Sequence, residues 1–211
     1  MKLENNVEAG TMEVRGEIGD FENGISASDF KTLLAEHDGG DIVMTLDSVG
    51  GCVSNGLECY NAIMSYEGNV TIVVDTMAAS IASVIAMSAD RLLIKSTAQM
   101  MIHRCWTMAV GNAVEFRQLA DVMDRLDLQL ASTYAEKAGG EPEDWMDAMT
   151  KETYYTADEA VAAGLADEVI KVTKERKAKA DAPKPRAYAP SLAASIVKGK
   201  NAARRLRLRV K

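Results

Sequence analysis

The chain has 211 residues, of which 47% are hydrophobic and 26% are charged, so it holds enough apolar side chains for one globular domain with a short appendage. This composition excludes a large multidomain protein and a chain that is disordered throughout. The net charge of −7 is distributed unevenly along the chain. Residues 1–170 hold 10 Lys and Arg against 29 Asp and Glu, whereas residues 171–211 hold 14 Lys and Arg against 2 Asp and Glu. An acidic body followed by a basic tail is predicted.

In chain order we expect a strand at 11–17, a helix at 26–36, a buried strand at 41–46, a helix at 52–66 and a buried strand at 69–75. There follow a wholly buried helix at 77–88, strands at 91–94 and 98–103, a long amphipathic helix at 112–138, helices at 143–149 and 156–163, and a closing segment at 165–172. Strands that alternate with helices at short spacing predict an α/β fold with a largely parallel sheet. Such sheets bind ligands where strands end and helices begin.

The composition changes abruptly after Val172, and three of the four prolines lie beyond it. We therefore predict a body at 1–172, a flexible Pro- and Lys-rich linker at 173–190, and a basic tail at 191–211 that forms a helix on a partner.

Targeting and redox signals are sparse. The longest weakly polar run, 77–89, is too short for a membrane span of about 20 residues, and no apolar stretch follows the N-terminal lysine as a secretory signal would require. Three cysteines without a CxxC pair (Cys52, Cys59 and Cys105) favour a reducing compartment over a disulfide framework or a zinc site. We expect a cytoplasmic protein without a metal site, in which the cysteines are small packing residues.

Histidine is the commonest general base near neutral pH, and this chain has two. His37 falls in the last turn of the first expected helix, where a cation complements the helix dipole, so we interpret it as structural. His103 ends an apolar strand and is the candidate base.

Two further segments contain candidate catalytic groups. Ser80 lies within 77–83 (MAASIAS), just inside a helix that follows a buried strand, and the free amide of Ile81 could face an oxyanion. Gly50 and Gly51 end another buried strand and leave backbone N–H groups open to a carbonyl. A small-residue helix and a plain turn are the structural alternatives.

Four motifs in this order resemble the proteolytic subunit of the Clp protease, and more closely the Clp-like head-maturation proteases of tailed bacteriophages. They are DSVGG at 47–51, MAASIAS at 77–83, MIHR at 101–104 and YYTADEAVAAGLADEV at 154–169. The resemblance covers about Val14 to Val172. It implies the spiral of ββα units shared by ClpP and crotonases, with a long projecting helix.

The resemblance also assigns roles by position. It makes Ser80 the nucleophile, His103 the general base, the Gly51 and Ile81 amides the oxyanion hole, and Glu152 the acid of the triad. It implies a substrate-binding edge that includes Gly50, Cys52, Val53, Arg104 and Cys105, along which peptide adds as a strand.

Two positions depart from the family pattern. Glu152 stands where the family usually has aspartate, and Asp144 and Asp147 are reserve candidates for the acid. Val49 stands where proline usually precedes the glycine pair, which could loosen this loop.

The resemblance implies a serine endopeptidase that needs no metal or nucleotide in this chain. Its subunits would form a ring through the long helix, a hexamer or heptamer that is single or stacked. Because few residues precede the first expected strand, loops for an ATPase look short, and we favour a phage protease that processes scaffold or capsid proteins in the host cytoplasm or procapsid.

Alternatives stay open. The chain could be a cytoplasmic Clp subunit that works with an ATPase unfoldase, or a crotonase acting on acyl-CoA. A Ser-Lys peptidase is disfavoured by the scarcity of lysines between Ser80 and Lys151. A non-enzymatic capsid-assembly or nucleic-acid-binding protein could act through the basic tail, which would bind phosphates or an acidic protein partner.

Overall fold

The computed structural model describes residues 2–20 and 22–173, so most of the expected linker and the whole expected tail lie outside the described residues. The chain divides into Met1–Ile170 and Lys171–Lys211. The strands of the first unit are β1 (Lys2–Asn6), β2 (Thr11–Arg15), β3 (Ile42–Ser48), β4 (Val70–Ala79), β5 (Arg91–Lys95), β6 (Gln99–Ile102), β7 (Thr153–Thr156) and β8 (Glu168–Ile170). Its helices are α1 (Ala27–Ala35), α2 (Val53–Met64), α3 (Ile81–Met87), α4 (Ala113–Ala138), α5 (Pro142–Thr150) and α6 (Ala157–Ala162).

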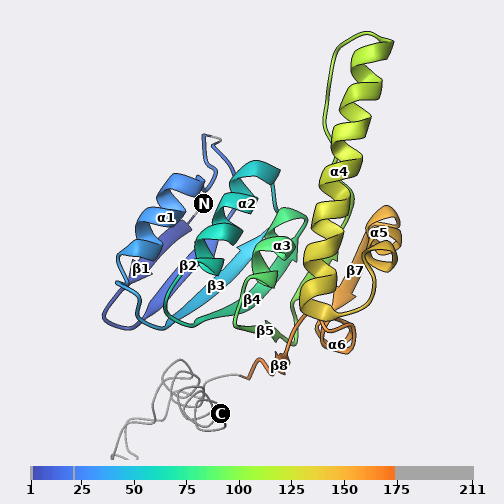
Figure 1. Ribbon diagram of the computed structural model, residues 1–211. Helices are drawn as coiled ribbons and strands as arrows, with labels where there is room; N and C mark the ends of the chain where they lie inside the picture. The colour runs from blue at the N-terminus through green and yellow to red at the C-terminus, as the bar shows by residue number, and fades with distance from the viewer. Residues whose placement is uncertain (1, 21, 174–211) are drawn as a thin grey trace, which may run out of the picture. The chain divides into compact units, whose positions relative to one another are not determined.

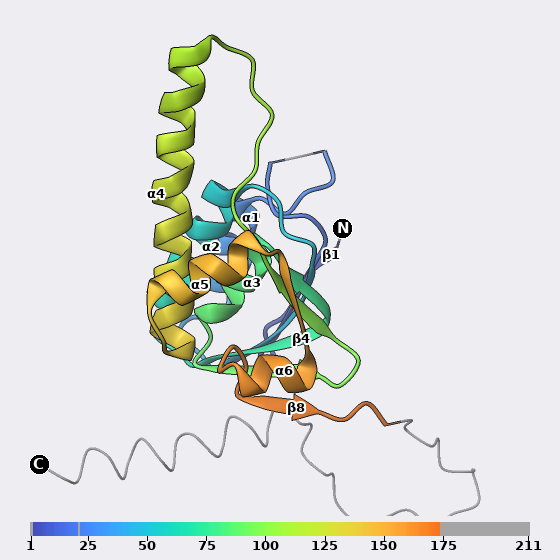
Figure 2. The same ribbon diagram turned by 90° about the vertical axis from the view of Figure 1, so that its right-hand side faces the viewer.

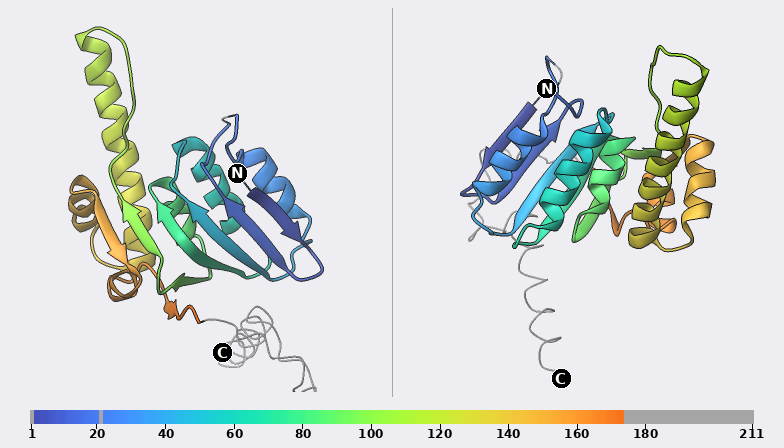
Figure 3. Two further views of the ribbon diagram at one scale, coloured as in Figure 1. Left: turned by 180° about the vertical axis from the view of Figure 1, so that it is seen from behind. Right: turned by 45° about the horizontal axis from the view of Figure 1, so that its top comes forward.

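One sheet organises this unit, in the order β1-β2-β3-β4-β5-β8. Strands β2, β3, β4, β5 and β8 are parallel, and only β1 on this path is antiparallel to its neighbour. The helices α1, α2 and α3 lie along one face of the sheet, whose other face is turned to the viewer in the left panel of Figure 3 (Figures 1 and 3). The predicted α/β architecture with a largely parallel sheet is confirmed.

The second half of β4 leaves this arrangement and pairs with β6 instead of β5. Residues 77–79 of β4 run parallel to 99–101 of β6, and β6 pairs in turn with β7, which is antiparallel. The carboxyl ends of β4 and β6 therefore lie side by side, at the edge where parallel sheets bind ligands.

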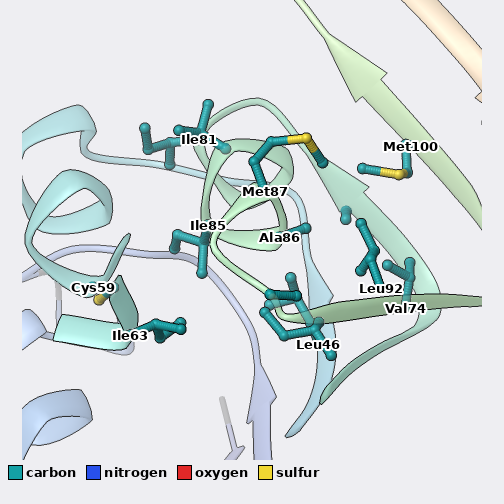
Figure 4. Packing of buried hydrophobic residues seen from close by; sticks show 14 of the residues in the cluster. Leu46, Cys59, Ile63, Val74, Ile81, Ile85, Ala86, Met87, Leu92 and Met100 are labelled. Carbon is teal, nitrogen blue, oxygen red and sulfur yellow. The ribbon is translucent and has the colours of Figure 1, made fainter. Parts of the chain in front are cut away.

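The apolar core lies between the sheet and helices α1, α2 and α3. All seven residues of α3 are buried. Figure 4 shows Ile85 and Ala86 of α3 among Leu46 and Leu92 from the strands and Ile63 from α2. Because these side chains are aliphatic or small, the helices approach the sheet closely.

Helix α4 begins at a capping box formed by Asn112 and Glu115, close to the predicted start. Its buried residues, among them Leu130 and Tyr134, all lie in its second half. The first half extends past the other helices of this unit (Figures 1 and 2). Apolar side chains such as Phe116 are exposed there. The predicted projecting helix is confirmed, and no helix within the described residues is both long and apolar enough to cross a membrane.

The helix expected at 77–88 begins four residues later than predicted. Strand β4 continues to Ala79, and α3 begins at Ile81. Small apolar residues fit both conformations, and here the pairing with β6 makes Met77–Ala79 extended.

Strands β1 and β7 were not expected, because their short polar sequences show no apolar alternation. His37 also differs from expectation, since α1 ends at Ala35 and the imidazole is buried against Asn5. Burial lowers the pKa of His37, so its neutral form is favoured and a cation at the helix dipole does not explain it.

The contact between α2 and α3 leaves no room for a side chain at Gly56. A Cβ there would lie 2.1 Å from Cγ1 of Ile81, which is 2% exposed. We predict that Gly56→Ala lowers the free energy of unfolding by about 1–2 kcal/mol, because overpacking outweighs the better helix propensity of alanine. Urea denaturation measures this change. In an Ile81→Ala background the same substitution should cost less, and equal costs in both backgrounds would contradict the proposed clash.

Candidate active site

Ser80 lies between β4 and α3 in a backbone conformation that is rare for a residue with a side chain. Its φ is 55° and its ψ −130°. The strand geometry holds this conformation, since the Ser80 amide donates a 2.9 Å hydrogen bond to the Met101 carbonyl of β6. Residues held in such strained conformations cluster at functional sites.

His103 follows β6 directly and meets Ser80 across the β4–β6 pair. Its Nε2 lies 2.7 Å from the Oγ of Ser80, although the two residues are 23 apart in sequence. Both side chains are half-buried. A hydroxyl that is hydrogen-bonded to an imidazole can be deprotonated as it attacks an electrophilic carbon.

The glycine pair after β3 packs against this serine. A Cβ at Gly50 would lie 2.7 Å from the Cβ of Ser80, and a Cβ at Gly51 would lie 2.1 Å from the carbonyl oxygen of Ile18. Both glycines have positive φ, 93° and 146°. Residues with side chains therefore cannot replace them without displacing backbone.

Ile18 also fixes the direction of the Gly51 amide. It donates to the Gly50 carbonyl and accepts from the Cys52 amide, at 2.8 and 2.7 Å. Since neighbouring N–H groups of an extended segment point to opposite sides, the Gly51 amide is turned away from Ile18. Neither it nor the Ile81 amide donates a hydrogen bond to any described residue.

A cavity of about 540 Å³ opens beside these groups. Its walls are mostly apolar, and they come from the glycine loop, from α2, α3 and α4, and from the segment around His103. The lining residues are Glu17, Val49, Gly50, Gly51, Cys52, Val53, Ser80, Ile81, Val84, Met101, His103, Cys105, Trp106, Leu130 and Tyr134. This volume is in the usual range for a ligand site.

The segment after His103 is anchored to α4 by a buried carboxylate. Asp127, whose side chain is 2% exposed, accepts hydrogen bonds from Nε of Arg104 and from the Cys105 amide, both at 2.7 Å. The exposed Asp124 binds the other side of the same guanidinium. Helix α4 thus holds the backbone that immediately follows the imidazole.

Glu152 is brought beside His103, but the two side chains are not hydrogen-bonded. The last pair of the β6–β7 ladder is Ile102 with Thr153, and His103 and Glu152 are the residues next to that pair in the chain. One acceptor also joins the two segments, because the Met149 carbonyl receives both the Arg104 and Glu152 amides, at 3.2 and 3.1 Å. The carboxylate itself accepts from the hydroxyl of Tyr154, at 3.2 Å.

The reserve acids lie elsewhere. Asp144 and Asp147 are exposed on α5, whose buried residues are Trp145 and Met149. Neither is hydrogen-bonded to His103 in the part of the chain that the structure describes.

The expected substrate edge is only partly extended. Gly50, Cys52 and Cys105 line the cavity, but Val53 is already the first residue of α2. The Arg104 side chain binds Asp124 and Asp127 and is not among the lining residues.

The three cysteines differ in their surroundings. Cys59 is buried as expected, and burial raises the pKa of its thiol to about 12. Cys52 and Cys105 are instead partly exposed cavity residues. The Asn55 backbone amide and the Ser54 hydroxyl lower the pKa of Cys52, whereas burial and the nearby Asp127 raise that of Cys105 to about 12.

Sequence reasoning missed Asp127, Tyr134 and Glu17 as residues of this region. Asp127 lay within an expected helix, three residues before the buried Leu130, and a charged residue on an apolar stripe was the available signal. Tyr134 was assigned to that stripe and closes the cavity, bonded at 2.7 Å to Ser83. Glu17 gave no signal in the sequence.

Comparison with known proteins agrees with this geometry. The family model described as Clp protease matches residues 8–173. The ATP-dependent Clp protease proteolytic subunit of Ligilactobacillus salivarius (strain UCC118) is 28% identical over 166 residues, which are 78% of this chain and 84% of that protein. The ATP-dependent Clp protease proteolytic subunit 3 of Rhodococcus jostii (strain RHA1) is 26% identical over 162 residues, 76% of this chain and 80% of that protein.

Among solved structures, a point mutant of ClpP1 from Listeria monocytogenes superposes with a TM-score of 0.69 at 21% identity, and the match covers 79% of this chain and 94% of that chain. This likeness shows a shared fold. Since the family model matches well over half of the residues, the chain belongs to the Clp protease family.

Proposed function

We propose that this member of the Clp protease family cleaves peptide bonds with Ser80 as nucleophile and His103 as general base. The family consists of serine peptidases that act on proteins, so the enzyme class follows from membership. The observation that carries the assignment of residues is the 2.7 Å contact between Ser80 Oγ and His103 Nε2 at the wall of an apolar cavity.

The reaction follows from the positions of these groups. As the Ser80 oxygen attacks the peptide carbonyl carbon, its proton moves to Nε2 of His103, and the carbonyl oxygen becomes an oxyanion. The Gly51 and Ile81 amides donate to that oxygen. When the C–N bond breaks, His103 gives the proton to the leaving amine, and an acyl-enzyme remains on Ser80. Water, deprotonated by the same imidazole, then releases the acyl group.

We propose Glu152 as the acid that orients His103. It directly precedes Thr153, the last ladder partner of Ile102, and the Met149 carbonyl accepts from both the Glu152 and the Arg104 amides. In the proposed active arrangement the carboxylate leaves Tyr154 and accepts from Nδ1 of the ring. A carboxylate there favours the imidazolium that forms during attack.

For the biological role, we propose processing of phage scaffold or capsid proteins in the host cytoplasm or procapsid, because the four motifs resemble head-maturation proteases most closely. Clp proteases form ring oligomers, and we propose a hexameric or heptameric ring, single or stacked, with contacts through α4. The first half of α4 exposes Val114, Phe116 and Val122. The curated relatives are named as ATP-dependent, so a subunit that works with an unfoldase is the second candidate. A role for residues 191–211 in binding an acidic partner rests on their charge alone.

Ser80→Ala should abolish peptide cleavage and labelling by a fluorophosphonate, because the nucleophilic oxygen is lost while the Cβ and the backbone are kept. The matched control, Ser65→Ala, removes a hydroxyl from an exposed serine at the end of α2 and should label normally. Labelling followed by mass spectrometry of the modified peptide measures both. Cleavage by Ser80→Ala at the wild-type rate would end the serine assignment.

Glu152→Gln should lower kcat by about 10²- to 10⁴-fold, as when an amide replaces the acid of a catalytic triad. Glu152→Asp should keep most of the activity, since it keeps the charge. The variants Asp144→Asn and Asp147→Asn are controls for the loss of a negative charge nearby. The comparison of kcat for these variants identifies the acid, and full activity of Glu152→Gln would exclude this residue.

Asp127→Asn should lower the free energy of unfolding by about 1–3 kcal/mol, because Arg104 loses its buried charged partner while the Cys105 amide keeps an acceptor. We also expect kcat to fall about tenfold at a temperature where the variant is folded, because the backbone beside His103 is held less firmly. The control Asp124→Asn should change stability by less than about 0.5 kcal/mol, since that carboxylate is exposed. Equal effects of the two substitutions would contradict a special role for Asp127.

A further inference from the structure

We propose that Glu17 selects substrates that carry an arginine or lysine near an apolar residue bound in the cavity, an inference that rests on the proposed peptidase function. Glu17 lines the cavity together with the proposed catalytic residues, and its side chain is exposed to solvent. Among the described residues, Glu17 supplies the only carboxylate that lines this cavity.

The backbone of Glu17 is fixed next to the proposed oxyanion loop. Its carbonyl accepts a 2.8 Å hydrogen bond from the Ile25 amide, and the next residue, Ile18, is bonded to both Gly50 and Cys52. The carboxylate therefore stands on a segment that cannot move independently of the Gly51 amide. A substrate whose carbonyl oxygen meets that amide would pass close to the Glu17 side chain.

No cation of the described chain neutralises Glu17. Within residues 2–20 and 22–173 its carboxylate makes no hydrogen bond or ion pair, and no lysine or arginine lines the cavity. The nearest arginine in sequence, Arg15, is bound to Asp75, Asp47 and Glu13 on the sheet. Arg104, which follows the catalytic histidine, is occupied by Asp124 and Asp127. A substrate cation would thus meet an uncompensated charge.

The remainder of the cavity wall favours an apolar side chain. Val84, Met101 and Leu130 supply aliphatic surface, and Tyr134 places its ring there while its hydroxyl is bonded to Ser83. An apolar residue gains free energy by leaving water for such a wall, and a charged one loses it. The cavity therefore binds the apolar residue, and its rim at Glu17 attracts the basic one.

The charge of the whole body acts in the same direction. Residues 1–170 hold 29 acidic against 10 basic residues, which raises the local concentration of basic peptides and repels acidic ones. At the rim, the attraction between the Glu17 carboxylate and one substrate cation about 4 Å away, both partly solvated, raises kcat/KM roughly 3- to 30-fold. An effect of this size is large enough to rank substrates.

A suitable probe is a quenched fluorescent peptide with the sequence of residues 201–211, in which Arg204–Val210 (RRLRLRV) combines basic and apolar residues. Its counterparts carry glutamine or glutamate in place of every arginine. The measured quantity is the ratio of kcat/KM for the arginine peptide to that for the glutamine peptide. For wild type we expect a ratio of about 3–30, which decreases toward 1 as ionic strength rises.

Glu17→Gln should lower this ratio to the smaller preference that the charge of the body alone gives, and Glu17→Lys should lower it further. The matched control Glu8→Lys changes an exposed carboxylate that does not line the cavity, and it should keep the wild-type ratio. A wild-type ratio near 1, or a ratio that Glu17→Gln and Glu8→Lys change equally, would overturn the role of Glu17. The role of Glu17 is also overturned if the fluorophosphonate labels Ser80 but the enzyme cleaves none of the three peptides. If the fluorophosphonate does not label Ser80, the proposed peptidase function itself is overturned.

Discussion

The site depends on the parallel pairing of β4 with two different partners. Its first half pairs with β3 and β5 in the middle of the sheet, and its last three residues pair with β6. The Ser80 amide continues that second pairing by donating to Met101. Because main-chain hydrogen bonds set this register, the separation between the backbones of Ser80 and His103 is determined before any side chain of the site is placed.

The glycine pair follows from the same arrangement. Strands β3 and β4 are parallel neighbours, so the loop after β3 arrives beside the end of β4, and a register shift after Leu46 brings Ser48 opposite Ala78. Gly50 then meets Ser80 at a distance that excludes a side chain. The strained φ of Ser80 persists because β6 on one side and this loop on the other leave it no alternative.

Periodicity and motifs predicted the order of most elements, and they singled out several residues that line the cavity, such as Ser80 and His103. They failed where tertiary pairing decides the local conformation, as at Met77–Ala79, whose small side chains suit a helix and whose partner β6 makes them extended. They also failed for β1, a polar edge strand. Glu17 was missed for another reason: its place beside the cavity follows from the tertiary fold, and nothing in the sequence around it indicates that place. Asp127 differs, because its position on the apolar stripe of α4 was a signal that the sequence did contain.

The parts of the proposed triad are held with unequal stiffness, and the topology explains why. Ser80 and His103 sit on adjacent strands, whereas Glu152 lies one position beyond the β6–β7 ladder in a left-handed turn with φ of 50°. A glutamate has one more rotatable bond than the usual aspartate, and the carboxylate of Glu152 accepts a hydrogen bond from Tyr154 in this structure. The proposed nucleophile and base are thus aligned by the sheet itself, whereas the position of the proposed acid depends on its side-chain rotamer.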